Sequence, residues 1–546
     1  MNVDTYLEVI LKSDPNEIKS LCSTNRFYNT ICKENKEYIS KKLLERYQVD
    51  YSDPGNFIYI INKVRYNPSR TLYEILKLYL VYYDETEIEV NDGITSIPMY
   101  PNLESLDCYN GSEELGLTSL PMFPKLKELV CAYNQLTSLP MYPELTTLNC
   151  SNNPLRNLPM YPKLKNLRCY NNQLTSLPMY PKLEKLSYSG NQPISLPTFP
   201  ELKELECSNR SDLELGLTNI PMFPKLKVLS CSNNQLTSLQ LYPELVELDC
   251  SLNQLTSLPM YPKLTSLDCF NNQLTSLLVY PNLERLSCVG NQLTSLPMYP
   301  ELTELDCAGN QLTSLPMYPK LEILDCSHHN FTDLPMYPKL TNLVCSSNQL
   351  TSLPMYPELT ELDCSNNQLT SLPMFPKMKE LFCDDNKLTN LQTYPELRVL
   401  YCKYNGMTSL PLLPELTRLS CSNNRLVSLP MYPKLEILIC SNNRLKSLPM
   451  YPVLTRLNCP NNKLGSLEMY PELTELYCSS NRLTSLLTYP KLEILDCSSN
   501  RITSLPMFPE LTSLECNNNQ ITSLPAYPKI EYCSCDELCR PPPLQD

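Results

Sequence analysis

A 19-residue spacing of cysteines runs through most of this 546-residue chain. Cys307, Cys326 and Cys345 lie 19 residues apart, and the same slot can be followed from Cys108 to Cys535 across two short insertions. This makes 23 repeats, with cysteine in 22 slots and Tyr188 in the other. A fixed period of this kind is typical of solenoids, in which each repeat packs only on its neighbours. We therefore expect an elongated stack of similar turns.

Each repeat begins with an alternating pattern that predicts a short strand. Residues 304–308 alternate in polarity, so Leu305 and Cys307 should point inward while Glu304, Asp306 and Ala308 point outward. The Pro-Met-Tyr-Pro segment that follows cannot be α-helical, because proline lacks the N–H and disfavours a helical residue before it. An extended, polyproline-like return is expected there.

The pattern L-x-x-L-x-C-x-x-N-x-L resembles the leucine-rich repeat over about residues 94–535. The following Leu-Pro-x-x-Pro-x-Leu looks most like the short repeats of bacterial type-III effectors and giant-virus proteins. The resemblance implies an α/β-type solenoid: a horseshoe of 23 repeats with a parallel concave sheet and an extended convex side. A small α-helical domain would precede it.

Two further columns should be internal. Asparagine follows the cysteine by three residues in 19 of the 20 uninterrupted repeats, with His329 as the exception, and its amide can satisfy backbone groups at the turn. An aromatic residue fills 22 of 23 slots in the Pro-Met-Tyr-Pro segment, with Leu413 as the exception. We interpret it as a spine packed against the next repeat.

The 26 cysteines are interpreted as core thiols rather than a disulfide framework. Disulfide scaffolds are usually short secreted chains, and this chain weighs 62.7 kDa and starts without a secretory signal pattern. We expect a reducing compartment, the cytoplasm, or the host-cell cytoplasm if the protein is viral.

The composition also argues against several functions. Two histidines and the lack of a phosphate loop, nucleophile elbow or metal-binding helix predict no enzyme activity, no cofactor and no metal. A formal charge of -13 argues against nucleic acid as a partner, and no run is long and apolar enough for a membrane span. The expected partner is a protein.

Residues 1–93 lack the repeat and show helical patterning. The run from Glu17 to Cys32 resembles the middle of an F-box, at about residues 5–47, although the leading Leu-Pro is missing and no tryptophan precedes Lys41. The resemblance implies contact with a Skp1-like adaptor through Ile18, Leu21, Cys22, Phe27 and Ile31. Alternatively, the segment is a helical cap on the first repeat. Residues 536–546 form a tail.

The residue just before each cysteine should form one column on the concave face. It is acidic in the middle of the chain and apolar or aromatic further on, which suggests a partner with basic and apolar elements. The candidate binding residues are Asp249, Asp268, Asp306, Asp325, Asp363, Phe382, Tyr401, Ile439 and Tyr477. Drift among duplicated modules is the alternative explanation.

The sequence therefore predicts a non-enzymatic protein-binding scaffold. One alternative is a substrate receptor of a cullin-type ubiquitin ligase, and another is a structural or decoy protein without a specific partner. The insertions at residues 111–117 and 210–217 could also take part in binding.

Overall fold

The computed structural model describes residue 42, residues 86–89, residue 97, and residues 99–111, 116–191, 196–209 and 216–536. The chain divides into two compact units, Met1–Leu264 and Thr265–Asp546. The predicted helical domain, apart from residue 42 and residues 86–89, lies outside the described residues, as do Ile18, Leu21, Cys22, Phe27 and Ile31 and most of the tail.

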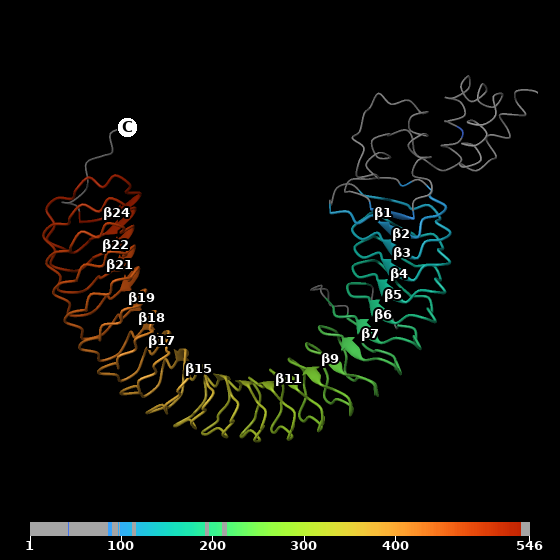
Figure 1. Cartoon of the computed structure of the whole chain (residues 1–546), viewed down its shortest axis with the longest axis horizontal. Coiled ribbons are helices and arrows are strands. Elements are labelled where there is room, and N and C mark those ends of the chain that lie inside the picture. Colours follow the sequence, from blue (N-terminus) through green and yellow to red (C-terminus); the bar gives the residue numbers. More distant parts are fainter. Residues whose placement is uncertain are drawn as a thin grey trace, which may run out of the picture. The chain divides into compact units, whose positions relative to one another are not determined.

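From residue 86 on, the described residues of both units form three-residue strands connected by turns and extended chain (Figure 1). The strands of the first unit are β1 (Glu87–Glu89), β2 (Ser105–Asp107), β3 (Glu128–Val130), β4 (Thr147–Asn149), β5 (Asn166–Arg168), β6 (Lys185–Ser187), β7 (Glu204–Glu206), β8 (Val228–Ser230) and β9 (Glu247–Asp249). Each pairs in parallel with the next.

The second unit continues the same pattern. Its strands are β10 (Ser266–Asp268), β11 (Arg285–Ser287), β12 (Glu304–Asp306), β13 (Ile323–Asp325), β14 (Asn342–Val344), β15 (Glu361–Asp363), β16 (Glu380–Phe382), β17 (Val399–Tyr401), β18 (Arg418–Ser420), β19 (Ile437–Ile439), β20 (Arg456–Asn458), β21 (Glu475–Tyr477), β22 (Ile494–Asp496), β23 (Ser513–Glu515) and β24 (Tyr532–Ser534). Within this unit the stack bends, and the strands line its inner side (Figure 1).

The strands confirm the repeat and correct two details. Strands β2–β24 match the 23 predicted repeats, but each ends three residues after it starts, so β12 stops at Asp306 rather than Ala308. The chain turns at Gly309, which has a φ of 65°, although Cys307 N–H still donates to Asp325 O at 2.9 Å. Among residues 216–536 no helix accompanies the strands, so the expected α/β type is not seen in this part.

The sheet begins before the first recognisable repeat. The strand β1, which the repeat pattern did not predict, pairs in parallel with β2, and Ile88 lies opposite Leu106. The two insertions leave the register intact, because Leu106 pairs with Leu129 and Leu205 with Leu229. Residues 112–115 and 210–215 of these insertions lie outside the described residues.

The asparagine ladder, the column three residues after each cysteine, is confirmed as a buried amide network. The Asn367 side-chain N–H groups donate to Cys345 O at 2.9 Å and Cys364 O at 3.1 Å, and its Oδ1 accepts Leu350 N–H at 3.0 Å. One side chain therefore satisfies polar groups of its own repeat and of the preceding one. Buried backbone groups need such partners, since an unmade hydrogen bond there is costly.

His329 replaces asparagine in this ladder with similar chemistry. Its Nδ1 lies 3.2 Å from Cys326 O and its Nε2 accepts Asn310 N–H at 3.4 Å. Burial lowers the pKa of His329 below its usual value, so the neutral imidazole is favoured. A neutral ring can donate from one nitrogen and accept at the other, as this position requires.

The residue before each ladder position takes a left-handed conformation in the uninterrupted repeats. Asn366 has a φ of 54° and Gly309 a φ of 65° at the same slot. Glycine and asparagine adopt this region most readily, which explains the frequent Asn-Asn pairs. The first asparagine makes the turn and the second satisfies the backbone.

The aromatic spine, the tyrosine and phenylalanine column of the Pro-Met-Tyr-Pro segments, is confirmed as core. The Tyr337 and Tyr356 rings are stacked with centroids 6.4 Å apart, and both are fully buried. The Tyr356 hydroxyl donates to Pro335 O in the preceding repeat at 3.0 Å. The phenolic group thus gives a part-buried proline carbonyl a partner that phenylalanine cannot provide.

The cysteine column is also confirmed as core. Its members from Cys108 to Cys516 are free and buried, whereas Cys535 is half-buried. Burial raises the pKa of Cys150 to about 12, the largest cause being desolvation of the thiolate. Several thiols contact a strand carbonyl of the next repeat, as Cys383 Sγ does with Tyr401 O at 3.3 Å. Each thiol acts as a small apolar group with a weak donor.

The asparagine ladder predicts that replacing a single ladder asparagine lowers the stability of the protein considerably. Asn367→Ala would leave Leu350 N–H and two cysteine carbonyls without their side-chain partner. We expect the free energy of unfolding to fall by about 2–4 kcal/mol. Urea titration of the full chain would measure this, and hydrogen exchange should accelerate at the Leu350 amide.

The neighbouring Asn366→Gly is the matched control. Asn366 is exposed, and glycine already holds the same slot at Gly309. We expect the free energy of unfolding of Asn366→Gly to change little. Equal losses in the two variants would contradict a structural role that is specific to the ladder.

Candidate protein-binding face

In the repeat strands β2–β23 the central residue is buried and the two flanking residues generally face outward. In β15, Leu362 is buried, Glu361 is exposed and Asp363 is half-buried. The predicted binding residues are all third residues of their strands. Asp249 lies on β9 of the first unit, and the other eight lie on β10 to β21 of the second. The structure places all nine on the outward face of their sheet.

The four acidic candidate residues of the second unit lie on four different strands. Asp306 and Asp325 are register partners on β12 and β13, and Val344 lies between Asp325 and Asp363. Asp268, on β10, is separated from Asp306 by Ser287. Burial, with a further contribution from the Asp325 charge, raises the pKa of Asp306 above its usual range. Like charges on adjacent strands repel, so this stretch carries an energetic cost.

These carboxylates also have a structural role, which the sequence analysis missed. Each accepts the backbone N–H two residues further on, as Asp325 does from Ser327 at 2.9 Å and Asp363 from Ser365 at 3.0 Å. The same bond is made by Asp249, Asp268 and Asp306. The sequence feature that could have predicted this role is an Asp or Asn just before a turn, because these side chains commonly accept a hydrogen bond from the backbone N–H two residues further on. One oxygen of each carboxylate is therefore already used in the turn, and only part of the group is available to a partner.

The aromatic stretch begins where the acidic one ends. Asp363 and Phe382 are register partners on β15 and β16, and Phe382 is in turn the partner of Tyr401 on β17. The two rings contact each other with centroids 5.1 Å apart and a tilt of 35°. Both side chains remain half-buried, so part of each ring faces water.

Ile439 and Tyr477 extend this stretch along the sheet. Ser420 separates Tyr401 from Ile439, and Asn458 separates Ile439 from Tyr477. At about 4.8 Å per strand, Tyr477 lies roughly 19 Å from Tyr401. The structure therefore brings Phe382 and Tyr401 into contact but leaves Ile439 and Tyr477 as separate points along the same column.

Cations flank the aromatic residues, as the sequence suggested. Lys403 Nζ lies 5.4 Å from the centre of the Tyr401 ring. The Arg456 guanidinium lies 5.8 Å from the Tyr477 ring, and its Nε is 3.2 Å from Glu475 Oε2. Such cation–π contacts are attractive, by about 0.5–1 kcal/mol each at exposed sites. Arg418 is exposed on β18.

The described part of the chain contains neither a candidate metal cluster nor a candidate membrane span. Among these residues no group of three His, Cys, Asp or Glu side chains is placed to hold a metal ion. No helix in the same residues is long and apolar enough to cross a bilayer.

One exposed column was missed altogether. The residue that follows each ladder asparagine is glutamine in many repeats but arginine or lysine near the C-terminal end, for example Arg444 and Lys463. Aligning the repeats and comparing this slot would have shown the change.

The comparisons with known proteins agree with this geometry. Residues 124–163, 281–320, 357–396, 471–510 and 490–529 match the family described as Leucine Rich repeats (2 copies). The structure is similar to YopM from Yersinia enterocolitica WA-314, with a TM-score of 0.59 and 30% identity, covering 87% of this chain and 97% of that one.

Two other solved structures are similar over a smaller part. YopM from Yersinia pestis is 28% identical, with a TM-score of 0.42, over 60% of this chain and 87% of that one. The functional domain of InlJ from Listeria monocytogenes is 28% identical, with a TM-score of 0.44, over 53% and 70% of the two chains. Among curated protein sequences, none matches this chain.

The burial of Asp306, together with the repulsion from Asp325 on the next strand, gives a pH-dependent prediction. Because the pKa of Asp306 is raised in the folded state, the folded protein binds this proton more tightly than the unfolded chain. Ionisation therefore lowers stability as the pH rises through the raised pKa, and this cost is absent below the unfolded pKa of about 3.9. Asp306→Asn keeps an oxygen for Ala308 N–H. At pH 7 it should raise the free energy of unfolding by about 0.2–1 kcal/mol.

Urea titrations at pH 7 and pH 3 would test this. The gain should vanish at pH 3. The control is Asp363→Asn, because the register partners of Asp363 are the uncharged Val344 and Phe382. A gain that persists in acid, or one equally large in the control, would refute the repulsion argument.

Proposed function

Because this chain belongs to the leucine-rich repeat proteins, we propose that it is a non-enzymatic scaffold whose protein partner docks on the outward face of strands β12–β21. The observation that carries this proposal is the row of Phe382, Tyr401, Ile439 and Tyr477. These apolar side chains lie half-exposed in a column that other repeats fill mainly with polar residues. Leucine-rich repeat scaffolds are typically non-catalytic, which supports a binding role.

Physical chemistry favours the aromatic stretch as the energetic centre. Removing apolar surface from water contributes about 25 cal/mol per Å², and aromatic residues dominate many interfaces. The strands that carry these side chains are held on both sides by parallel partners. Binding would therefore order little backbone, and less conformational entropy would be lost.

The acidic stretch would select the other half of the partner. Asp363 is the register partner of Phe382, and Asp325 and Asp306 lie two and three strands before Asp363 in the same column. A partner with a basic element beside an apolar one therefore fits both stretches. Charge complementarity would speed the encounter and fix the orientation more than it would add affinity. Asp268 and Asp249 extend the acidic character of their own units.

The free thiols of the cysteine column support a reducing location for this function. We place it in the cytoplasm, or in the host-cell cytoplasm if the protein is viral. The similarity to YopM structures supports a scaffold role and leaves the partner of this chain to experiment.

The docking face can be tested by changing the three rings together. Serine already occupies the same column at Ser287 and Ser420, so Phe382→Ser, Tyr401→Ser and Tyr477→Ser should be tolerated by the fold. A partner identified by proximity labelling with the full chain should bind this variant more than tenfold more weakly, since hot-spot residues each contribute about 2 kcal/mol or more. Biolayer interferometry would measure the dissociation constants.

A control with the same chemistry uses exposed tyrosines away from this column. Tyr109, Tyr133 and Tyr404 are 47%, 44% and 55% exposed. Replacing these three by serine should leave affinity unchanged. Unchanged capture by the column variant would refute the docking face, and a protein with no saturable partner would support the structural or decoy alternative.

A second candidate function rests on the N-terminal sequence alone. The F-box-like run from Glu17 to Cys32 would dock a Skp1-like adaptor and make the repeats a substrate receptor for a cullin ubiquitin ligase. Full-length protein carrying Leu21→Asp and Phe27→Asp should then lose a purified adaptor in a pull-down, while the repeat-face variant keeps it. Failure of the unmodified protein to capture the adaptor would remove this function.

A further inference from the structure

A row of cations follows the edge of the second unit. In its earlier repeats the residue after the ladder asparagine is glutamine, at Gln292, Gln311, Gln349 and Gln368. From β18 to β22 the slot is basic in every repeat, and in the β23 repeat it is again glutamine, at Gln520. We call this set the basic edge row, and it consists of Arg425, Arg444, Lys463, Arg482 and Arg501. All five are exposed.

Backbone hydrogen bonds place these residues in a straight register. Arg444 N–H donates to Leu426 O at 2.9 Å, and Arg482 N–H donates in the same way to Leu464 O at 2.9 Å. Arg425, Lys463 and Arg501 make the equivalent bond to the preceding repeat. The row therefore follows the strand spacing of about 4.8 Å and spans roughly 19 Å. It lies beyond the C-terminal ends of β18–β22.

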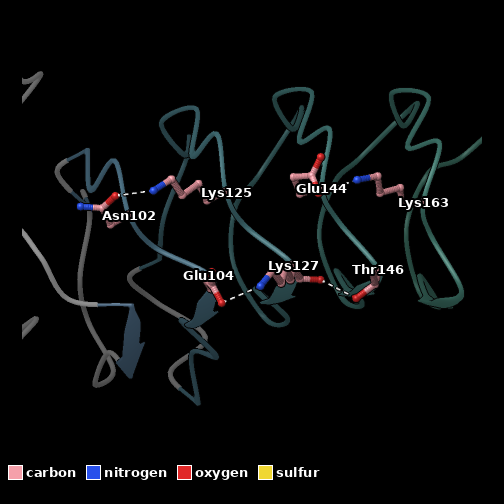
Figure 2. Close-up of polar contacts among 7 residues, drawn as sticks. All are labelled: Asn102, Glu104, Lys125, Lys127, Glu144, Thr146 and Lys163. Carbon is pink, nitrogen blue, oxygen red and sulfur yellow. Dashed lines mark hydrogen bonds and ion pairs between the residues drawn. The ribbon is translucent and has the colours of Figure 1, made fainter.

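The charges in this row have no ion-pair partner in the part of the chain that the structure describes. Within the described residues, none of the five takes part in an ion pair, although pairs across repeats are frequent elsewhere. Lys434 with Glu415 and Lys491 with Glu472 are examples in the same unit. Figure 2 shows this kind of pairing in the first unit, where Lys127 contacts Glu104 and Lys163 contacts Glu144.

The surrounding turns contain no compensating acid. The five segments that run from the column cysteine to the serine after the basic residue hold neither aspartate nor glutamate, at residues 421–428, 440–447, 459–466, 478–485 and 497–504. Lys446 adds one more cation. This local excess stands out in a chain with a formal charge of -13. Cations at this spacing repel one another unless an anion lies along them.

We infer that the basic edge row binds an extended acidic segment of a protein partner. Alternate side chains of an extended strand point to one side about 6.6–6.8 Å apart, so four carboxylates would span the row. Four of the five cations are arginine, whose planar guanidinium can hold a carboxylate through two hydrogen bonds. This surface rests on the scaffold role proposed above but does not need the aromatic column.

Other polyanions fit the row less well. Single-stranded nucleic acid is usually held by cations with aromatic side chains on which bases stack, and the five edge segments contain no aromatic residue. A membrane presents a flat anionic surface, whereas this row is one cation wide. The net negative charge of the chain also opposes long-range attraction to a highly charged polyphosphate.

The test uses a fluorescent peptide of alternating glutamate and serine, about twelve residues long. Fluorescence anisotropy with the full chain should show saturable binding that weakens as salt is added. Arg425→Gln, Arg444→Gln, Arg482→Gln and Arg501→Gln together should weaken it more than tenfold. Glutamine fills the same exposed slot in earlier repeats, so this variant should fold, and circular dichroism would check it.

The matched control removes four positive charges from paired lysines. Lys320→Gln, Lys377→Gln, Lys434→Gln and Lys491→Gln together give the same net charge as the row variant and should leave peptide binding intact. A second variant tests whether peptide binding can be added at another place in the same unit. Arginine at Gln292, Gln311, Gln349 and Gln368 should create a second row and raise the peptide stoichiometry.

Other results would overturn the inference. These are no peptide binding, equal losses in the row and paired-lysine variants, or binding only of an oligouridylate or of anionic vesicles tested in parallel. The serine variant of Phe382, Tyr401 and Tyr477 should still bind the peptide. Its behaviour therefore separates failure of the basic edge row from failure of the docking face.

Discussion

The buried asparagine amide is the interaction on which the rest of this structure depends. Each 19-residue repeat contains a strand of only three residues, so most of its backbone lies outside the sheet and must find hydrogen bonds elsewhere. Asn367 provides them for the repeat before it as well as for its own. Tyrosine hydroxyls do the same for the proline carbonyls. Because each repeat completes its neighbour, a single repeat would leave buried polar groups unsatisfied.

Because the core columns hold the repeats together, binding function is restricted to the remaining positions of each repeat. Leucine, cysteine, asparagine and tyrosine columns are enclosed by the next repeat, so changes there disturb the stack. The outward strand positions and the edge slot after each asparagine tolerate many side chains, and these are the positions where the repeats differ. The aromatic stretch and the basic edge row both occupy such slots. Asp325 and Asp363 are intermediate, since each combines an outward charge with a bond to its own turn.

Several parts of the candidate site could be predicted from the sequence, and others could not. The alternation around Leu362 and Cys364 correctly placed Asp363, Phe382 and Tyr401 on the outward face. The contact between the Phe382 and Tyr401 rings, at 5.1 Å, depends on the register between neighbouring strands. The bond from Asp325 to Ser327 N–H depends on the turn that follows. Neither contact can be predicted from the aligned repeat sequences, because the direction of each side chain depends on the local backbone geometry.

The sequence by itself determined the repeat, the number of repeats and the identity of the core columns. It could do so because one period repeated 23 times fixes which residues face inward. The tertiary structure decided how polar groups are shared between repeats, where the sheet begins, and which charges have partners. The strand at Glu87–Glu89 belongs to this second class, and so does the lack of an ion pair at Arg444 among the described residues. Both depend on contacts between residues that are distant in the chain, and a local pattern does not specify those contacts.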